Sequence, residues 1–239
     1  MRKLQILLFW LLSTESYAQV EVSAGAGIGW FSMSELGKLQ KTIQSSYPVD
    51  AKITEEFPAY VIYDAAIIWK LHSKGFLGLY YQYGSTGGRV HYEDFSGEVY
   101  SDQLLHYNTL ALSVGQGLSF GNDLQFRVDL HPGVTFTSLE IIEGGRIGDE
   151  SRRDSYKFHS INATLQPTVE LHKIWGQFGI KVYAGFHIAA YSGKLKFDEN
   201  KNSYLTGGGN DPIVANWNGF RLGLTGTYRI RGNEQAEDN

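Results

Sequence analysis

Eight segments of the chain alternate between apolar and polar residues with a period of two, which is the pattern of a β-strand whose two faces meet different surroundings. Each segment is longer than the roughly 5–6 residues usual for a strand in a soluble protein. The segments span residues 20–32, 58–71, 75–90, 103–120, 124–141, 156–175, 177–196 and 216–230. Long strands repeated in this way predict an all-β fold built from antiparallel neighbours.

The links between these segments alternate in length. Three links are short turns, and they comprise residues 72–74, 121–123 and 176–177. Four links are long and polar, and they comprise residues 33–57, 91–102, 142–155 and 197–215. Short turns at one end and long loops at the other are the layout of a transmembrane up-and-down barrel. The first long link also contains Ser34–Ile43, which is compatible with a short helix.

The two faces of the predicted strands differ in polarity. One face carries apolar residues such as Leu110 and Leu112, whereas the opposite face carries residues such as Arg127 and Asp129. Lys173 is the one charge in the apolar set, and it lies beside a short turn, where its amine can reach the interface. A soluble barrel buries its apolar face, and a membrane barrel turns that face toward lipid.

Aromatic residues flank the short turns, as expected for side chains at the boundary between lipid and water. They are Trp69, Phe76, Phe120, Phe126, Trp175, Phe178 and Tyr228. The strands are also long enough to cross a bilayer at a tilt of about 45°, which needs roughly 9–11 residues. These patterns favour an eight-stranded antiparallel up-and-down transmembrane β-barrel over a secreted lipocalin-like barrel.

The N-terminus predicts export. Basic residues Arg2 and Lys3 precede the apolar run Leu4–Leu12, and Ser16 and Ala18 are the small residues of a cleavage site. The apolar run is shorter than the roughly 20 residues that a transmembrane helix needs. We therefore predict that the mature chain lies in the outer membrane. The predicted organisation is a signal peptide at 1–18, the barrel at 19–230 and a polar tail at 231–239.

Composition narrows the possible functions. The chain has no Cys, which excludes disulfides, thiol chemistry, Cys-based zinc sites and a lipoprotein anchor. Its formal net charge is −4 and its pI is about 6.0, so it lacks the basic balance of a nucleic-acid-binding protein. We predict no interaction with nucleic acid.

The pattern as a whole resembles the small outer-membrane β-barrel family of Gram-negative bacteria, the OmpA/OmpX-type barrels. The stretch Tyr81–Gly97 looks like members from the Bacteroidota group. The resemblance covers essentially the whole mature chain, and it brings no catalytic motif with it. It implies a monomer that contacts outer-membrane lipids and lipopolysaccharide, and that is inserted by the barrel-assembly machinery.

Charged residues on the polar face must neutralise one another, because side chains fill the interior of an eight-stranded barrel. The strand heights place Glu170 between the cations of Arg127 and Lys181, with Asp129 and His172 nearby. Two further pairings follow from strand order and from the small glycines of the first strand: Glu21 with Arg229, and Asp64 with Arg221. The set could serve as an acid–base site or a proton path, and a structural ion-pair network is the interpretation we favour.

No residue set has the spacing of a known catalytic or metal site. His159 and Ser160 are adjacent and point to opposite faces, unlike the His-x-Ser pair of lipid A deacylase-type barrels. Residues His91, Asp94 and Ser96 share a loop without a specific spacing. The loop beginning Asp198–Asn202 is superficially like a calcium loop, but Ser203 and Gly209 occupy the places of the required Gly and Glu. We predict no catalytic residue, cofactor or metal ligand.

Pro132 and Pro167 lie at a similar height on neighbouring strands. Each proline lacks an N–H and removes one ladder hydrogen bond, which a closed barrel cannot hide at an edge. Palmitoyltransferase-like barrels are associated with prolines at a lateral opening, and by that resemblance the two residues suggest a lateral gate. The alternative is that each proline lies at a β-bulge, or at a position where the strand ladder has no backbone N–H hydrogen bond to lose.

The sequence predicts an integral outer-membrane barrel with a structural or surface-interaction role, such as envelope integrity, adhesion or resistance. The first alternative is a conduit for small or hydrophobic molecules, which would need a column of small interior residues. The second alternative is a lipid A-modifying enzyme. A polar interior filled by side chains would favour the structural or surface-interaction role over the conduit.

Overall fold

The computed structural model describes residues 19–71, 75–121, 123–207 and 211–230. The signal peptide predicted at 1–18 and the polar tail predicted at 231–239 lie outside the described residues. Within the described ranges, no helix is long and apolar enough to cross a membrane.

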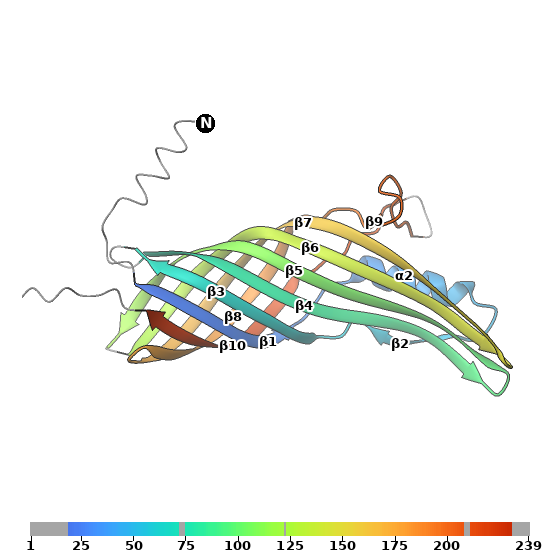
Figure 1. Cartoon of the computed structure of the whole chain (residues 1–239), viewed down its shortest axis with the longest axis horizontal. Coiled ribbons are helices and arrows are strands. Elements are labelled where there is room, and N and C mark those ends of the chain that lie inside the picture. Colours follow the sequence, from blue (N-terminus) through green and yellow to red (C-terminus); the bar gives the residue numbers. More distant parts are fainter. Residues whose placement is uncertain (1–18, 72–74, 122, 208–210, 231–239) are drawn as a thin grey trace, which may run out of the picture.

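Eight strands close into a ring, each antiparallel to both of its neighbours (Figure 1). They are β1 (Val20–Gly29), β3 (Tyr60–Lys70), β4 (Gly75–Asp94), β5 (Gly97–Phe120), β6 (Leu124–Ile147), β7 (Glu150–Trp175), β8 (Phe178–Tyr191) and β10 (Gly219–Ile230). β1 and β10 close the ring through a continuous register that runs from Val20 opposite Ile230 to Gly29 opposite Arg221. The predicted eight-stranded up-and-down barrel is confirmed.

The wall of the barrel is twice as tall on one side. The strands β4 to β7 have 20 to 26 residues, whereas β1, β3, β8 and β10 have 10 to 14. The prediction of long loops at 91–102 and 142–155 is therefore wrong. Both segments continue the β4–β5 and β6–β7 ladders as hairpins with tight turns, because backbone pairing persists where the apolar–polar alternation fades.

Three further elements fold against the tall side of the barrel: α2 (Ser34–Ser46), β2 (Lys52–Glu56) and β9 (Lys196–Phe197). The predicted helix is confirmed and extends three residues beyond the expected end. β2 pairs with β4 above the point where β3 ends, and β9 pairs with β7. The chain between β8 and β10 is longer than expected, because β8 stops at Tyr191 and β10 starts at Gly219. We call residues 31–59, 85–107, 137–158, 192–207 and 211–218 together the cap.

The predicted orientation of the two barrel faces is confirmed. Apolar side chains point outward and are exposed, for example Leu110 at 56% and Val128 at 52%. The predicted polar face is buried, including Arg127, Asp129 and Lys181. One of the aromatic residues predicted to lie at the boundary between lipid and water was assigned wrongly. Phe76 points into the barrel, where the centre of its ring lies 5.4 Å from the Arg127 guanidinium carbon.

The polarity of the two faces reverses partway along each tall strand. On β5 the inward side chains change from Thr109 to the fully buried Tyr107 and Leu105, while the outward side chains change from Leu110 to Asn108. The outward side chains change from Phe136 to Ser138 on β6 and from Ile161 to His159 on β7, within one pairing step of the change on β5. Below this level the barrel faces lipid, and above it the cap folds like a soluble protein with its apolar face inward.

Pro132 and Pro167 do not share one weakened seam. The β6–β7 ladder between them is continuous from Leu124 to Ile147. Pro132 lies where the register between β5 and β6 is interrupted, and Pro167 lies where the register between β7 and β8 is interrupted. Because the two missing bonds are on opposite sides of an unbroken strand pair, their positions do not combine into a lateral gate.

Candidate functional site

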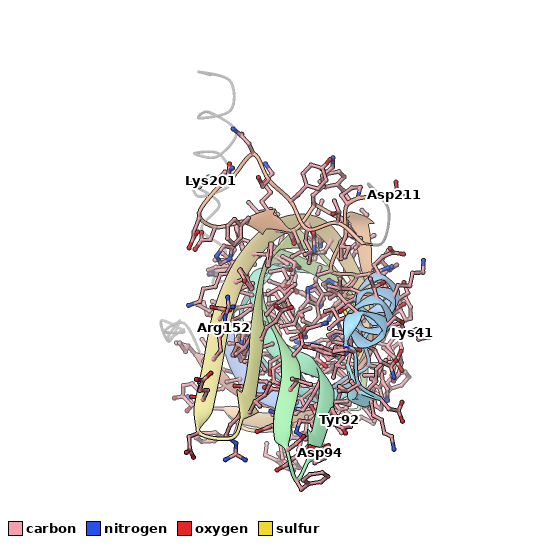
Figure 2. The ribbon with its side chains drawn as sticks, turned by 90° about the vertical axis from the view of Figure 1, so that its right-hand side faces the viewer. Lys41, Tyr92, Asp94, Arg152, Lys201 and Asp211 are labelled. Atoms are coloured by element: carbon pink, nitrogen blue, oxygen red, sulfur yellow. The ribbon has the colours of Figure 1, made fainter. Side chains whose placement is uncertain are left out.

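The interior of the barrel is closed by its own side chains, as the view from the cap end shows (Figure 2). Tyr80 stacks on His131 with ring centroids 4.3 Å apart, and Gln82 accepts a hydrogen bond from Tyr107. A cavity beside Tyr80 and His131 has a volume of only about 10 Å³. That volume is about the minimum for one water molecule, so this cavity is too small to pass a solute.

A buried ion cluster fills the short-turn end of the barrel, and its centre is Glu21. The two Glu21 carboxylate oxygens accept hydrogen bonds at 2.8 Å from the two terminal nitrogens of Arg127. Arg229 Nε donates to Glu21 Oε2 at 3.1 Å, which confirms the predicted Glu21–Arg229 pair. Glu170 lies opposite Arg127 across the β6–β7 ladder, as the strand heights predicted, and it pairs with Lys181 at 3.3 Å. The expected contact with the second cation is not formed, because the Arg127 guanidinium turns toward Glu21 across the barrel.

The predicted pairing of Arg221 with Asp64 is also wrong. Asp64 accepts hydrogen bonds from Tyr183 at 3.0 Å and from Thr225 at 3.1 Å. Arg221 instead points up toward the cap. It donates to the backbone carbonyls of Trp30 and Trp217, and its guanidinium carbon lies 4.7 Å from the ring centre of Phe31.

The polar interior has the arrangement of a structural network, the interpretation favoured from sequence. Glu21 and Arg127 form a two-bond contact that fixes both side chains in one geometry. Asp129 faces the small cavity and has no hydrogen-bond partner among the described residues. A proton path would need linked polar groups open to both ends, and the cap closes one of them.

The cap has a hydrophobic core of its own, which sequence analysis did not anticipate. Its centre is Trp217, whose ring centroid lies 4.5 Å from that of Tyr107 and 5.1 Å from that of Phe31. The indole Nε1 donates to Thr137 at 2.9 Å. Further buried residues come from α2 and the rest of the first long link, from the tall strands and from the last long link: Met33, Leu36, Leu39, Phe57, Leu105, Leu139, Ile141, Phe158, Leu195, Ile213 and Ala215. This core blocks the mouth of the barrel. The three-residue spacing of Met33, Leu36 and Leu39 is the sequence feature that could have predicted one buried face of this helix.

The structure separates the residues that could have suggested an enzyme. His159 is exposed on the outer face and Ser160 is buried on the inner face, as their adjacent positions predict. His91 pairs with Glu98 at 3.1 Å. Asp94 accepts hydrogen bonds from Ser96 and Tyr92 in the tip of the β4–β5 hairpin, and these bonds lower the pKa of Asp94 to about 2. Asp94 therefore stabilises a turn as a permanent carboxylate.

The segment that resembled a calcium loop is a polar turn. The side chain of Asn200 accepts a hydrogen bond from the backbone of Asn202 at 3.1 Å, and Asp198 lies 3.6 Å from His159. In the described ranges, no group of three or more His, Asp and Glu side chains is placed to hold a metal ion.

These features define the class of the protein: it is an eight-stranded transmembrane β-barrel of the outer-membrane type, with a filled interior and a folded cap.

No family model matches the chain, and no curated protein matches it. Solved structures do. Neisserial surface protein A matches with a TM-score of 0.45 and 10% identity over 90% of this chain and 98% of its own. The attachment invasion locus protein Ail of Yersinia pestis matches with a TM-score of 0.40 and 11% identity over 90% of this chain and 100% of its own. The N-terminal β-barrel domain of Pseudomonas aeruginosa OprF matches with a TM-score of 0.33 and 13% identity over 89% and 99%.

Proposed function

We propose that this chain is a non-conducting outer-membrane protein that uses its cap to contact other macromolecules outside the cell. We expect it to act as a monomer that the barrel-assembly machinery inserts. The resemblance of Tyr81–Gly97 to proteins from the Bacteroidota group stays a prediction.

The observation that carries this proposal is the combination of a blocked lumen with a large, ordered structure at one end. The interior cavity of about 10 Å³ argues against the conduit. The tall strands extend well beyond the apolar belt, and barrel stability alone does not require such extension. The separation of His159 from Ser160 argues against the lipid A-modifying enzyme, so we propose no catalytic role.

The cap sheet offers a defined contact surface. Residues 150–156 of β7 pair with β6 on one side, and no described strand pairs with them on the other. A free edge of this kind can accept an added strand. Arg152, Arg153 and Asp154 lie on it, and such charges limit indiscriminate pairing.

The orientation can be tested with single cysteines, because the chain has none of its own. We expect an impermeant maleimide to label Asn200→Cys in intact cells, since Asn200 is exposed in the cap. Asp123→Cys, exposed in a short turn, should react only after the cells are opened. Both variants should fractionate with the outer membrane. Labelling of Asp123→Cys alone in intact cells would reverse the topology.

The proposed role can be tested by trimming the cap. We design a variant in which Asn-Gly turns replace Tyr92–Val99 and Gly144–Arg153, joining residues that already face each other across the ladders. We expect this variant to insert normally and to abolish the attachment that the full chain gives to cells, measured on host-cell and abiotic surfaces against cells without the protein.

Three outcomes would contradict the proposal. If the trimmed chain supports attachment as well as the full chain, the cap tips at 92–99 and 144–153 are not the contact surface. If the purified full chain opens single channels in a planar bilayer, the conduit replaces the proposed role. If the trimmed and full chains restore detergent resistance equally, with no difference in attachment, the protein serves envelope integrity.

A further inference from the structure

A groove of about 860 Å³ runs along the outer wall where β7 passes from the barrel into the cap. One side of the groove is the outer surface of β6 and β7, and the other is the chain that follows β8. The groove crosses the level at which the strand faces reverse polarity, since Ile161 lies just below that level and His159 just above it. Its lower half therefore faces the acyl layer and its upper half faces the headgroup layer.

The floor of the groove is apolar. Val134 and Ala163 are cross-strand partners on the outer face, and Ile161 lies next to them with 58% of its surface exposed. Tyr191 pairs with Ala163 at the last step of the β7–β8 ladder and forms one side. A floor of small and branched apolar side chains at this depth matches the shape and polarity of an acyl chain.

The rim of the groove is cationic. Lys194, Lys196 and Lys201 line it, and Asp198 is the one acidic residue among the described lining residues. The Lys194 amine lies 4.5 Å from the ring centre of Tyr204. Lysine amines just outside the acyl layer attract anionic headgroups, and lysine binds phosphate as a point charge.

The segment that carries the lysines is held firmly against β7. The Gly193 amide donates to the buried Asn162 side chain at 2.9 Å, and a side chain at Gly193 would come within 2.4 Å of the Ile161 carbonyl oxygen. Lys196 lies opposite His159 in the β7–β9 pairing. The charges are thus part of an ordered rim above the apolar floor.

We propose that this groove binds a phosphorylated lipid of the outer leaflet, with a headgroup phosphate on the lysine rim and an acyl chain along the floor. The placement of the floor below the polarity boundary favours a membrane lipid over a soluble anion or a protein. The site goes beyond the proposed contact function and does not depend on it, because the trimmed tips 92–99 and 144–153 contribute no residue to the groove.

The test uses the purified full-length mature chain in detergent micelles, with bisphosphorylated lipid A as the probe and native mass spectrometry as the measurement. We expect one retained lipid A per chain. The triple change Lys194→Gln, Lys196→Gln and Lys201→Gln should weaken the affinity about tenfold or more, because each lysine near an anionic surface contributes separately. Ala163→Trp, which fills the floor, should also weaken binding while leaving the rim charges in place.

Matched controls remove equal charge and add equal bulk elsewhere. Lys38, Lys41 and Lys52 are exposed on α2 and β2, and Lys41 lies on the other side of the cap from Lys201 (Figure 2). Their triple change to Gln should leave the affinity within about twofold, as should Ala26→Trp on the outer face of β1.

Three results would overturn the proposal. Equal loss in the Lys38, Lys41 and Lys52 triple variant would show general charge attraction. Equal affinity for lipid A stripped of its phosphates would show that the lysine rim does not bind the headgroup phosphates. Full displacement of lipid A by inorganic phosphate would identify an anion site without a lipid requirement. The trimmed variant should still retain lipid A, whether or not it supports cell attachment. Its lipid A binding therefore tests the groove independently of the proposed contact function.

Discussion

Glu21→Gln is expected to destabilise the barrel by about 3–5 kcal/mol, because it leaves two buried guanidinium groups without their shared countercharge. The Glu21 side chain is fully buried, and both Arg127 and Arg229 donate to it. The glutamine keeps the shape of the side chain and removes only its charge. Urea unfolding in lipid vesicles, followed by the gel shift between folded and heated protein, measures the change.

The control for this prediction is Glu35→Gln on α2. Glu35 is paired with Lys38 at 3.0 Å, but both side chains are exposed, so the change should cost less than about 1 kcal/mol. The double variant Glu21→Gln with Arg229→Gln should recover part of the loss, because one surplus positive charge is removed. Equal unfolding midpoints for Glu21→Gln and Glu35→Gln would show that the Glu21 cluster does not stabilise the barrel.

Trp217→Ala is expected to unfold the cap and leave the barrel intact. Trp217 is fully buried at the centre of the cap core, and truncation of such a residue costs about 3–5 kcal/mol. The barrel below is held by its own closed ladders and ion cluster. Amide exchange in micelles should therefore quicken across α2 and residues 192–207, while β1 and β10 keep their protection.

A matched control is Trp30→Ala, at the same mouth but 43% exposed on the outer face. This change should leave cap exchange nearly unaffected, since the Trp30 carbonyl that binds Arg221 belongs to the backbone. The barrel interior of Trp217→Ala should still block conductance, because Tyr80 and His131 remain in place. Loss of protection throughout both β1 and α2 would mean that cap and barrel unfold as one unit.

The sequence by itself determined the barrel: its strand number, its pairing direction and which side chains face lipid. These properties are local, because alternation with a period of two sets the face of every residue once one residue is placed. Leu110 and Arg127 could be assigned to opposite faces without knowing any neighbour. The same reasoning failed at 91–102 and 142–155, where Gly, Ser and charged residues on both faces hide strands that the ladder continues.

Only the tertiary structure decided which interior charges meet. Glu21 contacts Arg127 and Arg229, which are 106 and 208 residues away along the chain. Strand height indicated that Arg127 was within reach of Glu170, but a long side chain can cross the lumen and reach another wall. The prolines show the same limit, because strand height cannot tell which neighbouring ladder each missing N–H belongs to.

The cap, too, was decided by tertiary packing. Its core joins α2, the tops of the tall strands and residues 192–207 and 211–218, each of which is too short or too polar to bury an apolar face alone. Trp217 falls at the start of the predicted strand segment 216–230, and nothing beside it in the chain marks it as the centre of a core above the barrel. A periodic pattern specifies the face of a strand locally, whereas burial in an irregular segment depends on partners that only folding brings together.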